Sequence, residues 1–191
     1  MNRKHVSLSA KNAAIHGENM PSPQNAIAPQ EVLAVIQQDD LFQQWQERNK
    51  EAFLSHFFSS VTAEGTPTQD WEVGFFNPAT EKITVFLQTN NAIEIKPADD
   101  VFKNESMTVE KLDVEKVMIP FEKARELCLD NVPAYFPREQ FGNGFVTLQT
   151  INGRTLWNFT FITRSLKFAN VKINAENGEV SSHDVIELVQ K

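Results

Sequence analysis

Apolar residues recur at helical spacing in the first part of this chain. Pro29 can occupy the first turn of one helix, and Asp40, with Gln43 three residues later, resembles the capping box of a second helix. In the second helix the apolar residues fall mostly on one face, at spacings of three, four and seven. Those apolar residues are Val32, Leu33, Val35 and Ile36 in the first predicted helix and Leu41, Phe42, Trp45, Ala52 and Phe53 in the second.

Beyond residue 56 the apolar residues are grouped in short runs rich in aromatic and β-branched side chains. Turns containing Gly, Pro and Asn separate these runs, which is the pattern of antiparallel strands. The tetrapeptide at 77–80, NPAT, is expected to connect a hairpin. The predicted strands of this region are 57–62, 71–76, 83–87 and 92–95.

The second half begins after a charged, weakly periodic segment that we interpret as a linker. Pro120 is expected to start a helix whose buried stripe includes Cys128, and the Val132–Pro133 pair is expected to end it. Asn152–Gly153 and Asn177–Gly178 are strong turn signals. The strands predicted around these turns are 145–151, 155–163, 168–173 and 180–181.

A shift of 86 residues superposes part of the first half on the second. Both Trp71 on Trp157 and Phe75 on Phe161 are matched without a gap, and further apolar residues follow in step. This match favours an internal duplication. The other matched pairs are Val73 with Phe159, Phe76 with Ile162, Val85 with Val171, Leu87 with Ile173 and Asn91 with Asn177.

These patterns together predict an α+β protein made of two repeated units. Each unit would be a helix packed on a small antiparallel sheet, with the two sheets side by side or facing. The predicted divisions are a flexible tail at 1–28, a first unit at 29–96, a linker at 97–113 and a second unit at 114–191.

The second half resembles the PepSY and PepSY-like family. The resemblance rests on NVKINAENGEV at 170–180, on WNFTFITRSLKF before it and on the amphipathic PFEKARELCL upstream. The first half matches only through the repeat, with TNNA at 89–92 in place of the Gly-Glu turn. The resemblance implies a small non-catalytic module of a class associated with protease propeptides and with inhibitory or regulatory roles outside the cytoplasm. It supplies no catalytic residues.

Charge and cysteine content limit which classes of partner and which cellular location are expected for this protein. The net charge is −7, and because residues 1–29 carry +2, the rest carries −9, which disfavours binding to the phosphates of nucleic acids. The single Cys128 cannot form an intrachain disulfide, and the start of the chain contains no apolar run that could be a signal-peptide core. No segment is long and apolar enough to suggest a membrane span. A cytoplasmic location without membrane or nucleic-acid partners is therefore expected.

Motifs for catalysis, metals and cofactors are missing from the sequence. The four His residues are scattered, and Gly142-Asn143-Gly144 is not completed to a phosphate-binding loop. Cys128 lies between two Leu residues of an amphipathic helix, as expected of a small buried hydrophobic residue. We therefore expect no cofactor and no enzyme, although catalytic groups can converge from distant positions.

The remaining hypothesis is recognition by aromatic residues that lie where a sheet edge or a groove at a helix end could form. The leading function is a non-enzymatic binding or regulatory protein that recognises a protein or peptide. The alternative is a small-molecule carrier with an apolar pocket between helix and sheet. The same aromatic residues could instead close the core between the two units. The candidate binding residues are Phe57, Phe58, Tyr135, Phe136, Arg138 and Phe141.

Overall fold

The computed structural model describes residues 28–89, 92–100 and 108–187. The strands form one antiparallel sheet in the order β4-β3-β2-β1-β5-β6-β7-β8. The helices are α1 (Pro29–Gln38), α2 (Asp40–Arg48) and α3 (Phe121–Tyr135), with a short 3-10 helix, η1 (Val114–Lys116). The strands are β1 (Phe53–Val61), β2 (Glu72–Asn77), β3 (Lys82–Thr89), β4 (Ala92–Asp100), β5 (Phe141–Ile151), β6 (Arg154–Thr163), β7 (Lys167–Asn174) and β8 (Val180–Glu187).

The two four-stranded halves of this sheet are joined through their first strands. β1 pairs with β5 in antiparallel orientation, and the ladder runs from the pair His56–Gln149 to the pair Val61–Gly144. The prediction of two repeated helix-on-sheet units is therefore wrong: the described residues form mainly one eight-stranded sheet with three α-helices. The physical reason is that the first strand of each half would otherwise be an unpaired edge.

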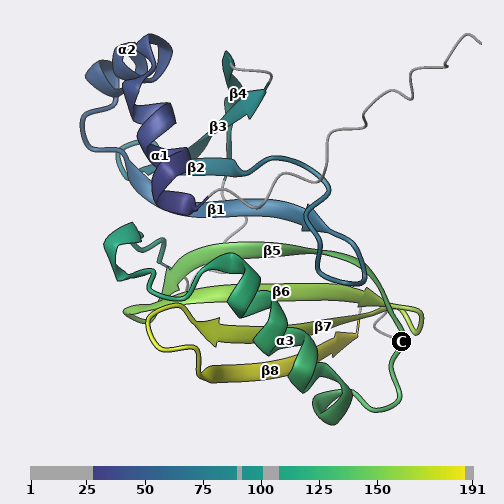
Figure 1. Ribbon diagram of the computed structural model, residues 1–191. Coiled ribbons are helices and arrows are strands. Elements are labelled where there is room, and N and C mark those ends of the chain that lie inside the picture. The colour runs from purple at the N-terminus through teal and green to yellow at the C-terminus, as the bar shows by residue number, and fades with distance from the viewer. Residues whose placement is uncertain (1–27, 90–91, 101–107, 188–191) are drawn as a thin grey trace, which may run out of the picture.

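All three α-helices pack against the same face of the sheet (Figure 1). At the first half, Phe42 of α2 contacts the rings of Phe75 and Phe86 at centroid distances of 5.0 and 5.1 Å. At the second half, α3 contacts β6, β7 and β8. We call this side of the sheet the helix face and the other side the open face.

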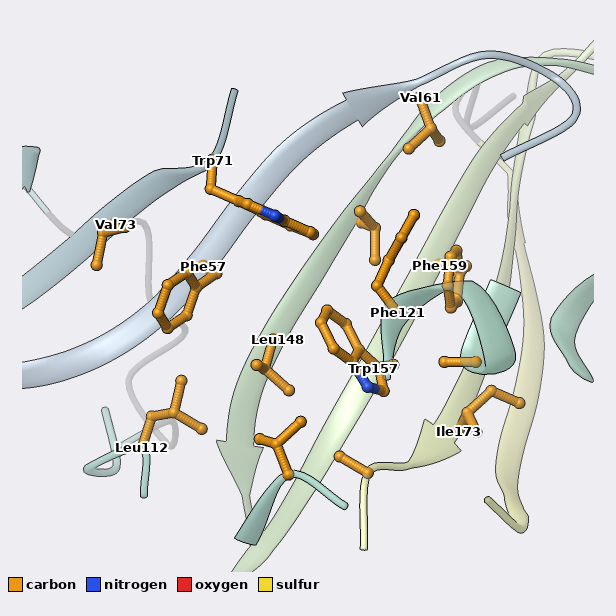
Figure 2. Packing of buried hydrophobic residues seen from close by; sticks show 14 of the residues in the cluster. Phe57, Val61, Trp71, Val73, Leu112, Phe121, Leu148, Trp157, Phe159 and Ile173 are labelled. Carbon is orange, nitrogen blue, oxygen red and sulfur yellow. The ribbon is translucent and has the colours of Figure 1, made fainter. Parts of the chain in front are cut away.

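The core of the helix face is continuous across the β1–β5 junction (Figure 2). Phe121, the first residue of α3, contacts Trp71 from the first half and Trp157 from the second, with ring centroids 5.5 and 5.7 Å away. The two Trp rings are 5.9 Å apart, and Trp157 Nε1 donates to the Ile119 carbonyl oxygen at 2.9 Å. The tryptophans that suggested a repeat therefore lie in one common core.

The two halves also differ in strand phase after the hairpin that joins their second and third strands. The inward residue is Phe86 in β3 and Val171 in β7, and both are fully buried. The 86-residue shift aligns Val85 with Val171, whereas the structural equivalent of Val171 is Phe86. The alignment by the repeat is therefore wrong by one residue in this strand. The cause is the turn length, since residues 78–81 connect β2 to β3 whereas 164–166 connect β6 to β7. The helices also differ between the halves: the first half has the pair α1 and α2, whereas the second half has the single helix α3.

Several element boundaries differ from the predictions. α2 ends at Arg48, so Phe53 begins β1 instead of extending the helix. β4 continues to Asp100 and Leu112 is buried in the core, so both ends of the predicted linker join folded structure. α3 continues past Pro133 to Tyr135, which is possible because only the last turn loses a backbone donor.

Other local predictions are confirmed. Asn77–Thr80 turns between β2 and β3, and Asn152–Gly153, both with positive φ, turn between β5 and β6. Except for Ala28, the predicted tail lies outside the described residues. None of the described helices has the length and apolar character needed to cross a membrane.

Candidate functional site

No described helix covers the open face of the sheet (Figure 1). Side chains alternate between the two faces along each strand, so the neighbours of core residues point to the open face. Phe57 is fully buried on the helix face, and the next residue, Phe58, lies on the open face opposite Thr147 of β5. The same alternation brings residues from β1, β5, β6, β7 and β8 together there.

Large apolar side chains lie together at one end of this face. Phe58 stacks on Phe145 with ring centroids 5.7 Å apart, and Phe145 contacts Phe168 at 6.5 Å. Phe168 is the cross-strand partner of both Ile162 and Ile186, which are 42% and 59% exposed. We call these five residues, Phe58, Phe145, Ile162, Phe168 and Ile186, the open-face patch. Such a contiguous apolar group on an uncovered surface is typical of an interaction site.

A row of polar residues borders the patch. Asn170 Nδ2 donates to Thr160 Oγ1 at 2.7 Å and to Asn158 Oδ1 at 2.5 Å. Asn170 is 8% exposed, and its Oδ1 has no hydrogen-bond partner among the described residues; the same is true of the buried Thr147 Oγ1. Unpaired buried polar atoms cost free energy, and burial closes both of these atoms to groups that approach from solvent.

Charges at this border are balanced within the chain. Lys172 Nζ lies 3.6 Å from Asp184 Oδ2 across β7 and β8, and Lys96 Nζ lies 2.6 Å from Glu72 Oε1 toward the other end of the open face. These groups leave the open-face patch without a strong charge of one sign. The site therefore offers apolar contact rather than attraction to a polyanion.

His56 occupies the opposite end of the open face, beside a β-bulge in β1. Its ring lies over Gly74, where an added Cβ would come within 2.2 Å of His56 Cε1. Burial lowers the pKa of His56, and the nearby Glu72 carboxylate acts in the opposite direction. The imidazole is thus expected to be neutral at pH 7.

The hydrogen bonds of Ser55 do not favour a serine nucleophile activated by this histidine. Ser55 Oγ donates to the Gly74 carbonyl oxygen at 3.0 Å, so it can only accept from His56 Nδ1, also at 3.0 Å. A general base must take the hydroxyl proton, and this proton is already committed elsewhere. Ser55 is also 4% exposed.

Other reactive groups are equally unsuited to catalysis. Cys128 is buried among core residues, and burial raises the pKa of its thiol to about 12. Within 28–89, 92–100 and 108–187, no group of three or more His, Cys, Asp or Glu side chains could hold a metal ion. The described residues therefore give no evidence of catalytic activity.

The six residues predicted to form one groove are separated in the structure. Phe57 belongs to the core, whereas Phe58 belongs to the open-face patch. The other four lie at or just after the end of α3: Tyr135, Phe136, Arg138 and Phe141.

At that end of α3, the aromatic rings pack mainly on one another. Tyr135 stacks on His183 of β8 with centroids 3.8 Å apart, and Phe136 contacts Phe141 at 5.9 Å. Phe136 is 5% exposed, so it completes the core, whereas the Arg138 side chain is exposed. The predicted groove is therefore not assembled, and only Phe58 reaches the patch.

Sequence reasoning missed four residues of the open-face patch. Ile186 lies beyond the strand predicted at 180–181, because β8 continues to Glu187. The sequence pattern places Phe145, Ile162 and Phe168 in strands but does not decide which face they occupy. The available signal was their position: each immediately adjoins a residue that faces the core. Using that signal requires the strand register, which depends on partners distant in the sequence.

Comparisons with known proteins leave the family open. No family model matches the chain, and no curated protein matches it. A solved structure with a similar fold is that of a "putative lipoprotein" from Clostridium difficile 630, with 15% sequence identity and a TM-score of 0.47. The alignment covers 78% of this chain and 97% of that chain.

This likeness is too weak to carry an argument about function or location. The resemblance to the PepSY family remains a prediction, neither supported nor contradicted by these searches. The description of the protein as a cytoplasmic α+β repeat must be corrected: one sheet dominates the fold, and nothing in the comparisons supports a cytoplasmic location.

Proposed function

We propose that this chain is a non-enzymatic binding protein that recognises another protein through the open face of its sheet. The observation that carries the proposal is the open-face patch, because its apolar side chains lie on the side that no described helix covers. Aromatic residues such as Phe58 and Phe145 contribute large contact areas with little loss of side-chain freedom.

The chemistry of the site describes the partner. An aliphatic or aromatic side chain of the partner would pack on Phe145 and Phe168. A folded protein surface offers such side chains. Because Lys172 and Asp184 neutralise each other, the partner surface needs no net charge of a particular sign.

A small-molecule carrier has less support. The space between α3 and the sheet is filled by Phe121, Ala124 and Cys128, which are 3%, 0% and 0% exposed. A shallow open hollow lies elsewhere, on the surface of α2, and is lined by Phe42, Gln43, Gln46, Glu47 and Lys50. A carrier would need an enclosed apolar cavity, so the interior packing favours the protein-binding function.

The test compares captured proteins between variants with equal fold stability. Ile162→Lys adds a charge to the patch at a side chain that is already 42% exposed, and Met118→Lys is the matched control because Met118 is 69% exposed outside the patch. We expect a partner captured by the wild type and by Met118→Lys to be lost with Ile162→Lys. Equal capture by both variants would contradict the proposed site.

Hydroxyl-radical footprinting of the purified complex provides a second measurement because it reports on individual side chains. Phe145 and Phe168 should be protected by the partner, whereas Tyr135 on the helix face should not change. Protection of Tyr135 without protection of Phe145 would place the partner on the wrong face and refute the proposal.

A further inference from the structure

β8 forms one outer edge of the sheet and pairs only with β7 among the described strands. Residues 183–187 are exposed, including Val185 at 43% and Ile186 at 59%. On the outer side of an edge strand, every second residue presents an N–H and a C=O group that no neighbouring strand satisfies. This edge can therefore accept another strand.

The two outer edges of the sheet differ in how they resist such pairing. In β4 a bulge interrupts the ladder between Lys96 and Asp99, the partners of Val85 and Ile83 in β3. Pro97, which has no N–H group, lies within this interruption. In β8 the irregularity is confined to the start, and pairing is regular from Ser182 to Glu187. Residues 180–187 contain no Pro, Lys or Arg. Bulges, prolines and lysines are the usual protection of edges, so β8 is the less protected edge.

We propose that the β8 edge binds a second copy of this chain, with the two β8 strands antiparallel around a two-fold axis at Val185. The inference is independent of the open-face function. A two-fold axis perpendicular to the sheet leaves the helix faces of both copies on the same side of the extended sheet. Residues that lie directly opposite each other across the two β8 strands must therefore belong to the same face. Only registers centred on a residue satisfy this condition.

Charge selects among these registers. A centre at Val185 places His183 opposite the partner's Glu187, and this contact occurs twice by symmetry. A two-fold axis at Asp184 would place the Asp184 carboxylates of the two copies opposite each other. An axis at His183 would place the two His183 imidazoles opposite each other. Tyr135 stacks on His183 at 3.8 Å and holds its ring at the edge. The charge pattern of β8 is thus complementary to itself in one register.

The chain already uses this type of contact internally. β1 and β5 are the first strands of their halves, and they join edge to edge in antiparallel orientation to make one sheet. Pairing of two β8 strands would extend the sheet in the same way across both copies. It would also satisfy the backbone groups that the edge leaves open.

Disulfide trapping of the full chain tests the register. In Val185→Cys the two new thiols would be directly opposite, with Cα atoms about 4.5–5.5 Å apart, which is within the range of a disulfide. The native Cys128 is buried and its thiol has a pKa of about 12, so it competes poorly. With oxidised glutathione, Val185→Cys should form covalent dimers much faster than Ile186→Cys or Leu166→Cys, although Ile186 and Leu166 are more exposed. Equal rates in the three variants would overturn the proposal.

Sedimentation equilibrium in the micromolar range tests the dimer itself. Val185→Lys would place two ammonium groups opposite each other and should raise the dimer dissociation constant roughly tenfold or more. Val185→Thr, which keeps the β-branched shape, should remain dimeric, and so should Ile162→Lys. A wild-type chain that stays monomeric refutes the proposal. Loss of the dimer in Ile162→Lys with retention in Val185→Lys would assign self-association to the open face and refute it as well.

Discussion

Replacing Phe121 with alanine tests whether both halves of the chain share one core. Phe121 is 3% exposed, and its ring contacts Trp71 of the first half and Trp157 and Phe159 of the second at centroid distances of 5.5, 5.7 and 6.0 Å. Removing a fully packed Phe costs about 3–5 kcal/mol of unfolding free energy, through lost transfer free energy and the cavity left behind. In a protein of this size each kcal/mol corresponds to about 2–4 °C, so Tm should fall by roughly 6–20 °C.

The assay is urea unfolding followed by tryptophan fluorescence and by far-ultraviolet circular dichroism. Because Trp71 and Trp157 lie in one cluster, the two signals should change together in one transition, and Phe121→Ala should move both by the same amount. Leu166→Ala is the control, since a side chain that is 58% exposed should change stability by less than about 0.5 kcal/mol. Two separate transitions in the wild type, or a loss below about 1 kcal/mol in Phe121→Ala, would refute the shared core.

Three further predictions concern local contacts. Gly74→Ala should lower the unfolding free energy by about 1–3 kcal/mol in urea melts, because the new methyl group would overlap the His56 ring. Burial lowers the pKa of His56, so the unfolded chain binds a proton at His56 more readily than the folded chain does. Tm should therefore fall as the pH drops through about 6.5, the ordinary pKa of histidine, and His56→Gln should reduce that fall. Glu110→Ala should cost about 1 kcal/mol in the same melts, because Glu110 accepts from the N–H groups of Asn152 and Gly153 at 2.6 and 2.8 Å. No change in any one measurement would contradict the corresponding contact.

Local features of the fold were predictable because their causes are local. The Asn152–Gly153 turn follows from backbone angles that Asn and Gly tolerate, and Pro29 begins α1 because its fixed φ suits a first turn. The helical stripe that includes Phe121 and Cys128 was also recognised and is buried. The α2 boundary was wrong because Phe53 fits either the helical stripe or a strand, and its pairing with Phe76 decides for the strand.

The binding surface was less predictable, because it depends on which face each strand residue occupies. Phe57 and Phe58 are adjacent and of the same type, yet one is fully buried and the other belongs to the open-face patch. A bulge in β1 between Leu54 and His56 shifts the alternation, and this bulge has no distinct signal in the amino-acid pattern. Phe145 and Phe168 come from separate strands and meet only through the pairing order.

The sequence by itself determined the kinds of elements, their approximate order and the turns, since alternation, helical spacing and Gly, Asn and Pro positions act over a few residues. Only the tertiary structure decided that β1 pairs with β5 and that Phe121 joins Trp71 to Trp157 in one core. Those contacts join segments far apart along the chain, and their free energy comes from burying edges and apolar faces against each other. The same long-range pairing leaves Phe58, Phe145 and Phe168 on the open face, where we propose that the protein binds its partner.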